Sequence, residues 1–200
     1  MSKIITISRQ FGSGGREFAR KLAENLGYAY YDKQILHEIA EHTELSEEYI
    51  KSVVDRKPQN LFPLSIGHSF GGGMDYQLQQ MQQIFGAQFD TINELADKSD
   101  CVIVGRCADY ILREKNPFRI FVYADMDKRI QRCIEHVQGD ESSDPDVVKK
   151  WIIKLDKDRA RYYEDYTGQK WGDKEFFDLC VNTSKFDIPE LAKSLADFLR

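Results

Sequence analysis

The stretch Ser8-Arg9-Gln10-Phe11-Gly12-Ser13-Gly14-Gly15-Arg16-Glu17 decides the fold of this chain. It follows an apolar run, residues 4–8, that predicts a buried strand, and it precedes residues 18–26, whose apolar positions have helical spacing. Glycines permit positive φ and close approach of a ligand, and a helix that starts after them points backbone N–H groups at an anion. The stretch therefore indicates a phosphate-binding turn; the alternative is a tight turn without a ligand.

Two standard phosphate-binding patterns fit this turn only in part. The dinucleotide pattern GxGxxG fails because Glu17 stands in place of the third glycine. In the P-loop pattern GxxxxGK[ST], Arg9 replaces the first glycine, Gly15 the lysine, and Arg16 the hydroxyl residue. A P-loop lysine normally reaches the β- and γ-phosphates, so we expect Arg16 or Arg9 to supply the missing charge.

Further apolar runs predict the rest of a sheet. Predicted strands cover residues 28–31, 101–104, 119–123 and 178–181, and predicted helices cover 18–26, 33–41, 77–98, 147–166 and 188–199. This alternation predicts an α/β three-layer sandwich with a five-stranded parallel sheet and helices on both faces. The segment 57–75 holds two prolines and four glycines, so we expect a mobile loop there rather than a second domain.

Composition narrows the classes of function. The chain has 200 residues, with 28 Lys and Arg against 33 Asp and Glu, so its net charge is −5. That balance argues against a general nucleic-acid binder, and no apolar run is long enough to cross a membrane. No signal peptide is evident, so we expect a cytoplasmic protein. The four cysteines form no CxxC pair, which argues against structural zinc. We expect Cys101 and Cys180 to be buried thiols.

Four segments together resemble the cytidylate kinase-like family, a divergent branch of the P-loop nucleoside monophosphate kinases. They are residues 7–16, which resemble the Ser-Arg-x-x-Gly-Ser-Gly-Gly loop of that branch, and residues 31–36, 104–112 and 156–171. The resemblance implies one P-loop kinase-like domain over residues 1–200, with a mobile acceptor-binding insertion at about 33–98 and a lid at about 129–158. It also implies ATP and Mg²⁺ as cofactors and CMP or dCMP as the acceptor. Partners would be small-molecule nucleotides, not nucleic acid or membrane. The helix at 77–98 packs on the sheet or forms a homodimer contact.

The resemblance also assigns residues to roles. Those expected to bind the phosphates of ATP are Gly12, Ser13, Gly14, Gly15 and Arg16. Those expected to be catalytic are Arg16, Arg106, Asp156 and Arg159. Those expected to bind the acceptor are Asp32, Arg106, Asp156 and Arg159. Arg129 and Arg132 would belong to the lid, and no residue is assigned to a metal.

Position along the chain supports some of these roles and leaves alternatives open. Arg106 follows a predicted strand, and ligands of open α/β sheets bind at the carboxyl ends of strands. A guanidinium suits a phosphate, although Arg106 could instead pair with Asp109. Asp32 precedes a predicted helix and could simply be its N-cap.

The predicted helix 147–166 carries an Asp-x-x-Arg element, Asp156 and Arg159, which resembles that of cytidylate kinases. These two residues share one face of a helix, and the alternative is a solvated charged surface. The Arg-Asp pair that usually lies just upstream is replaced by Ile152 and Ile153, so the sequence leaves the acceptor base open.

Three functions fit the sequence. The first is a kinase of nucleoside monophosphates. The second is a nucleotide-binding regulatory protein with weak catalysis, which the absent P-loop lysine motivates. The third is a kinase of a non-nucleotide small molecule, since fold does not fix the substrate.

Overall fold

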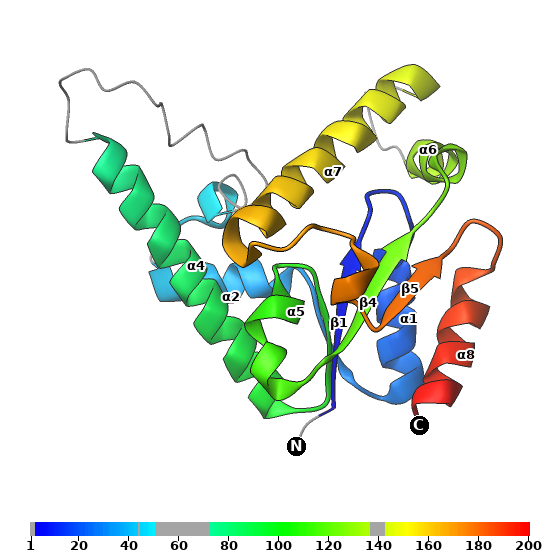
Figure 1. The fold of residues 1–200 in the computed structure, drawn as a ribbon, viewed down its shortest axis with the longest axis horizontal. Coiled ribbons are helices and arrows are strands. Elements are labelled where there is room, and N and C mark those ends of the chain that lie inside the picture. Colours follow the sequence, from blue (N-terminus) through cyan, green and yellow to red (C-terminus); the bar gives the residue numbers. More distant parts are fainter. Residues whose placement is uncertain (1–2, 44, 51–72, 137–142) are drawn as a thin grey trace.

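A computed structural model describes residues 3–43, 45–50, 73–136 and 143–200. The sheet has five parallel strands in the order β2-β3-β1-β4-β5, with β1 at its centre (Figure 1). The strands are β1 (Ile4–Arg9), β2 (Ala29–Tyr31), β3 (Cys101–Val104), β4 (Phe118–Tyr123) and β5 (Leu179–Asn182). All five predicted strands are confirmed, each within one residue at either end. Parallel pairing sets the carboxyl ends of all five strands along one edge of the sheet.

Helices connect the strands. They are α1 (Gly15–Leu26), α2 (Gln34–Thr43), α4 (Gly73–Lys98), α5 (Ala108–Ile111), α6 (Met126–Glu135), α7 (Pro145–Thr167) and α8 (Ile188–Leu199). Short 3₁₀ turns cover Arg113–Lys115 and Lys174–Phe176. The predicted loop at 57–75 is wrong over 73–75, which begin α4; its residues 57–72 lie outside the described residues. Part of the predicted lid, residues 137–142, also lies outside the described residues. So does part of the predicted acceptor-binding insertion, residues 44 and 51–72.

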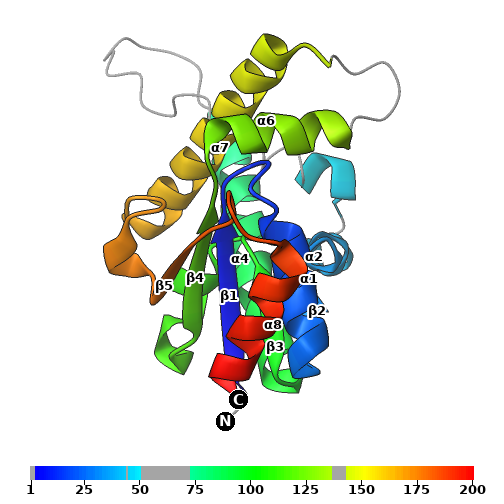
Figure 2. The ribbon, with the colours of Figure 1, turned by 90° about the vertical axis from the view of Figure 1, so that its right-hand side faces the viewer.

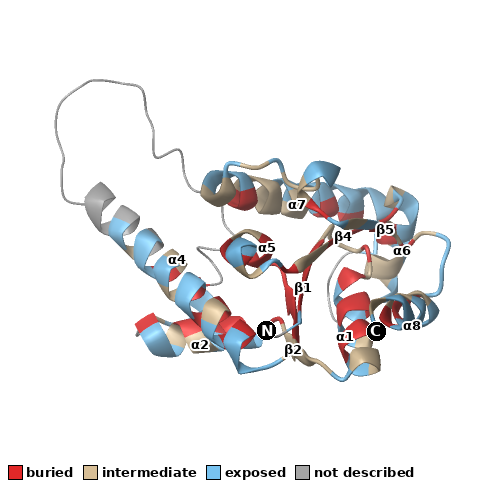
Figure 3. Cartoon of the chain, turned by 60° about the horizontal axis from the view of Figure 1, so that its bottom comes forward, coloured by how far each residue is buried: buried red, intermediate tan, exposed pale blue. Residues whose placement is uncertain are grey.

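The molecule has three layers. Helices α1 and α8 lie side by side on one face of the sheet, and α2, α4 and α5 lie on the other, with the end of α7 beside them (Figures 1 and 2). Ile5 and Ile7 of β1 pack toward α1 with the fully buried Phe18 and Leu22, whereas Ile4 packs into the opposite core. The buried residues of α1 and α8 pack with those of β1, β3 and β4 in one core, and the outer sides of these two helices are exposed (Figure 3). Burying one such side chain contributes about 1.5–3 kcal/mol.

The two cysteines that the sequence predicts to be buried differ. Cys101, on the inner strand β3, is fully buried, but Cys180 on β5 is exposed, so that prediction is wrong. Strand β5 is the edge of the sheet, and side chains alternate along it, so Val181 enters the core while Cys180 faces the opposite, open side. Among the described residues, no helix is long and apolar enough to cross a membrane.

Candidate active site

The glycine turn between β1 and α1 requires its glycines. Gly12 and Gly14 have φ of 73° and 76°, a conformation that residues with a Cβ rarely adopt. A Cβ on Gly12 would lie 2.9 Å from both the carbonyl oxygen of Arg129 and Sγ of Cys133. Helix α6 therefore packs directly against the turn, and only a residue without a side chain at position 12 permits this contact.

Buried and partly buried hydrogen bonds hold the turn to neighbouring elements. The Ser13 side chain is fully buried, and its Oγ donates to the carbonyl of Gln10 at 2.8 Å. The carbonyl of Ser13 accepts from Oγ1 of Thr183 at 2.6 Å and from Nη1 of Arg132 at 3.1 Å. These bonds join the turn to the end of β5 and to α6. Ser13 therefore stabilises the turn from inside, and its predicted contact with ATP stays a prediction.

Asp156 and Arg129 hydrogen-bond to the backbone of Phe11 in the glycine turn. Oδ1 of Asp156 accepts from the backbone N–H of Phe11 at 2.7 Å, and Nε of Arg129 donates to the Phe11 carbonyl at 2.7 Å. The two side chains also form an ion pair, and Arg129 is buried. The sequence assigns Asp156 to the acceptor and Arg129 to a lid; among the described residues, neither belongs to the lining of the two cavities described below. Both roles stay predictions, beside a structural role that the contacts show directly.

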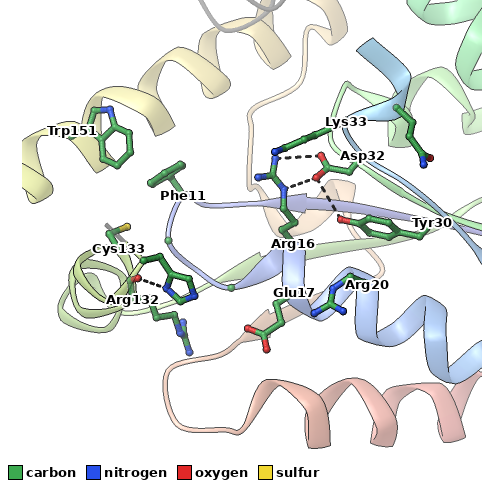
Figure 4. Close-up of a pocket in the computed structure, with 14 residues that line it drawn as sticks. Phe11, Arg16, Glu17, Arg20, Tyr30, Asp32, Lys33, Arg132, Cys133 and Trp151 are labelled. Atoms are coloured by element: carbon green, nitrogen blue, oxygen red, sulfur yellow. Dashed lines mark hydrogen bonds and ion pairs between the residues drawn. The ribbon is translucent and has the colours of Figure 1, made fainter. Parts of the chain in front are cut away.

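Two neighbouring cavities open at the carboxyl edge of the sheet. The larger, of about 800 Å³, lies in front of α1 and reaches Gly12, Gly14 and Arg132 (Figure 4). The smaller, of about 500 Å³, lies between the ends of β1 and β3 and one face of α7. The residues that line both are Phe11, Arg16, Asp32, Lys33 and Trp151. Both volumes fall in the range of small-molecule sites, about 300–1,000 Å³.

The smaller cavity is rich in arginine. Its cationic lining residues are Arg9, Arg16, Lys33, Arg106 and Arg159, and its acidic ones are Asp32, Glu47 and Asp158. Burial and the nearby Arg159 lower the pKa of Arg9 to about 9. Nη1 of Arg159 donates to the carbonyl of Arg9 at 3.2 Å, so the two side chains belong to one cluster. A cavity with this excess of positive charge suits a phosphorylated ligand.

Asp32 is the counter-ion inside the arginine cluster. Its carboxylate forms an ion pair with Arg16 (Figure 4). It also lies 3.8 Å from Nη2 of Arg9. The Tyr30 hydroxyl donates to Oδ2 of Asp32 at 3.4 Å, and burial, with the Asp32 charge, raises the pKa of Tyr30 to about 12. In the part of the chain that the structure describes, no N–H of α2 donates to Asp32, so the N-cap alternative is not supported.

The end of β3 is strained. Gly105, Arg106 and Cys107 follow one another with φ of 75°, 59° and 54°, although only the first is glycine. A Cβ on Gly105 would overlap the guanidinium of Arg9, and Nε2 of Gln88 donates to the Arg106 carbonyl at 3.0 Å. Left-handed non-glycine residues cluster at functional sites. The sequence placed Arg106 at this edge but carried no signal of its backbone conformation.

Sequence reasoning missed two further site residues, Phe11 and Trp151. Phe11 lies inside the glycine turn, and Trp151 belongs to no motif, so nothing in the pattern separated it from the other aromatic residues of α7. Tyr162 and Tyr163 are buried, and both also line the smaller cavity. The described residues contain no group of three or more His, Cys, Asp or Glu side chains that could hold a metal ion.

Comparison with known proteins gives one consistent family. The model of the cytidylate kinase-like family matches residues 4–185. A cytidylate kinase from Thermoplasma acidophilum is 26% identical, covering 96% of this chain and 90% of its own length. A cytidylate kinase from Methanopyrus kandleri is 24% identical, covering 95% and 89%.

Solved structures agree on the fold. An uncharacterized protein from Eubacterium ventriosum has a TM-score of 0.68 and 27% identity, covering 99% of this chain and 98% of that one. A shikimate kinase from Acinetobacter baumannii in complex with shikimate has a TM-score of 0.53 and 15% identity, covering 100% and 93%. The second likeness concerns the fold alone, and it confirms the P-loop kinase-like architecture that the sequence predicts.

Proposed function

The chain belongs to the cytidylate kinase-like family and is a phosphotransferase, and from this premise we propose that it transfers the γ-phosphoryl group of ATP to a nucleoside monophosphate. CMP and dCMP are the first acceptors to test. One observation carries the proposal: Arg9, Arg16, Arg106 and Arg159 converge on one cavity from three separate parts of the chain. Phosphoryl transfer depends mainly on positioning and charge stabilisation, which such a cluster supplies.

The two cavities suggest a division of substrates. Gly12, Gly14 and the start of α1 border the larger cavity, and a helix N-terminus favours phosphate. We assign the phosphates of ATP to that side. Arg106 and Arg159 border only the smaller cavity, and we assign the acceptor phosphate there. Arg16 lines both cavities, so it can contact the phosphoryl group that passes between the two substrates.

The chemistry needs little from the protein beyond charge and position. An oxygen of the acceptor phosphate forms a bond to the γ-phosphorus, and the bond from that phosphorus to the β,γ-bridging oxygen breaks, leaving ADP. A phosphate monoester is largely dianionic at neutral pH, so its oxygen needs no general base. The arginines stabilise the negative charge on the transferred group and hold the two substrates in line.

Arg16 is the proposed substitute for the P-loop lysine. Its side chain is 56% exposed, and it pairs with Asp32 at the mouth shared by both cavities. A bound polyphosphate can compete with Asp32 for this guanidinium, because a phosphate offers bidentate, charge-assisted hydrogen bonds. Before substrate binds, the ion pairs of Asp32 hold the guanidinium groups of Arg9 and Arg16 in place.

The residues also fit the use of Mg²⁺ with ATP. Magnesium usually keeps several waters and binds through one or two carboxylates and the substrate phosphates. Asp32 is a carboxylate that lines both cavities. When bound, the ion would neutralise phosphate charge; Asp32 would help to hold it, and Arg16 would orient the phosphates.

The experiment is to measure ADP release by the purified protein with ATP and Mg²⁺ against each nucleoside monophosphate in turn. Turnover with one or more acceptors supports the proposal, and its loss in Arg16→Ala, but not in Lys21→Ala, would identify Arg16 as the lysine substitute. Lys21 lies on the same helix and pairs with Glu24 away from both cavities. No turnover with any nucleotide would overturn the acceptor class.

A further inference from the structure

Two aromatic side chains stand where the two cavities meet. Phe11 extends from the glycine turn and Trp151 from α7, and their ring centroids lie 4.8 Å apart at an interplanar angle of 68° (Figure 4). Each lines both cavities. Trp151 is 43% exposed although it is in contact with Phe11. An indole is usually far more buried than that, so its open surface at a cavity mouth calls for an explanation.

Helix α7 connects this aromatic pair to the arginine cluster. Trp151, Leu155 and Arg159 repeat at every fourth residue, share one face of the helix and all line the smaller cavity. The guanidinium carbon of Arg159 lies 5.3 Å from the centroid of the Phe11 ring. One wall of the smaller cavity therefore carries positive charge near the strands and aromatic side chains at the cavity mouth.

We propose that the base of the acceptor nucleotide stacks on Trp151, with Phe11 supporting the indole, while the acceptor phosphate binds the arginine cluster. This inference rests on the proposed function and deepens it. A nucleotide separates its phosphate from its base by the ribose, so one molecule can reach both ends of this wall. Trp151 lines both cavities, but Leu155 and Arg159, which share its face of α7, line only the smaller one, and Arg159 also lies over the Phe11 ring, so the acceptor is favoured over ATP.

Stacking on Trp151 predicts which ligands the acceptor site would distinguish. Every base has a π-face, so an aromatic platform binds bases strongly but distinguishes them weakly. The two residues after Trp151 are Ile152, which is buried, and Ile153, which is exposed, and neither can hydrogen-bond a base. The platform should therefore separate nucleotides from base-free sugar phosphates much better than it separates one base from another.

Intrinsic fluorescence tests the contact directly, because the chain has two tryptophans. Trp171 packs edge-on against Phe121, so Trp171→Phe leaves Trp151 as the reporter with an aromatic ring retained at 171. CMP is expected to quench Trp151 emission with saturation, whereas ribose 5-phosphate, at concentrations that displace CMP, is expected not to. Quenching by ATP but not by CMP would assign the platform to the donor and overturn the proposal.

Kinetics separate this inference from the kinase itself. Trp151→Ala is expected to raise KM for the nucleoside monophosphate about tenfold or more, with a smaller change in kcat and in KM for ATP. Val147→Ala, one turn earlier on α7 and 48% exposed, is the matched control and is expected to leave both values unchanged. Because Trp151 is a surface residue, the variant is expected to fold, which circular dichroism checks.

The failures of the two proposals are distinguishable. Turnover of nucleoside monophosphates with an unchanged KM in Trp151→Ala and unchanged Trp151 emission would overturn the stacking platform and leave the kinase standing. Saturable quenching by CMP without turnover would support the platform and overturn the kinase. Neither quenching nor turnover would overturn both.

Discussion

The glycine turn and the end of β3 border the same site but are built in opposite ways. The turn is held by buried and partly buried hydrogen bonds from Ser13, Arg132 and Thr183. The end of β3 carries strained backbone at Arg106 and unbalanced positive charge around it. A standard P-loop combines rigid backbone and its cationic side chain in one motif, whereas here the turn supplies Arg9 and Arg16 but the further cations Arg106 and Arg159 come from distant parts of the chain.

The largest expected effect comes from placing a side chain in the rigid region. Gly12→Ala combines a positive φ with a Cβ 2.9 Å from the backbone carbonyl of Arg129, so the turn and α6 must separate. We expect a loss of about 1–3 kcal/mol in the free energy of unfolding and at least a ~100-fold loss of kcat/KM, because the phosphate-binding backbone moves. Chemical denaturation measures the free energy of unfolding, and the ADP-release assay measures kcat/KM.

Gly27→Ala is the matched control for Gly12→Ala. Gly27 has φ of 71°, nearly the same as Gly12, but nothing lies within 4 Å of an added Cβ at the far end of α1. The strain alone should cost about 1–2 kcal/mol, with kcat/KM unchanged. Equal losses of activity in both variants would show that the close packing of α6 on the turn has no part in catalysis.

The next effect tests the cationic region. Arg106→Gln removes the charge that we propose contacts the acceptor phosphate while keeping a polar side chain, and we expect kcat/KM to fall about 100-fold. Arg113→Gln, on the outer surface where its guanidinium covers the Tyr110 ring, is the control and should leave kcat/KM unchanged. If Arg106→Gln retained wild-type kinetics, the cluster would not bind the acceptor phosphate.

A smaller effect follows from the pKa of Arg9, which burial and Arg159 lower to about 9. Sulfate keeps its two charges between pH 8 and 10, whereas Arg9 loses its proton as the pH rises through about 9. Because a bound anion favours the protonated guanidinium, sulfate affinity should be highest below pH 9. Above it, affinity should fall up to about tenfold per pH unit. Calorimetric titration at pH 8, 9 and 10 measures it, and Arg9→Gln should abolish the dependence.

The smallest effect concerns the acceptor base. Ile152 and Ile153 offer no hydrogen bonds, and stacking on Trp151 discriminates weakly, so kcat/KM for CMP and UMP should differ by less than about tenfold. Steady-state kinetics with both acceptors at fixed ATP checks this. A preference above a thousandfold would require hydrogen-bond readout of the base and would contradict recognition by stacking alone.

Much of the fold could be predicted from the sequence. Strands of four to six residues were recognisable because buried parallel strands are short apolar runs, and α8 was predicted to the residue because its apolar spacing is regular. Cys180 was mispredicted because an apolar run does not show which strand will be the edge of the sheet. The start of α4 was mispredicted because two glycines precede it and a third is its first residue, and glycine usually ends helices rather than beginning them.

The site was predictable in part. Gly12, Arg16 and Arg106 were found because a turn after a strand, or a residue at a strand end, has a position that local sequence determines. The sequence identified Asp156 but not its contacts with the glycine turn, because its partners Phe11 and Arg129 are distant along the chain. No local pattern reports contacts across such separations.

The sequence by itself determined the alternation of strands and helices, the glycine turn and the resemblance to one kinase family, because each of these depends on residues close together in the chain. Only the tertiary structure decided that Arg9 and Arg159 join one cluster, that Asp32 serves as its counter-ion and that Trp151 stands at the cavity mouth. The physical reason is that burial, charge neutralisation and stacking depend on which distant segments meet, and packing of the sheet against its helices sets that.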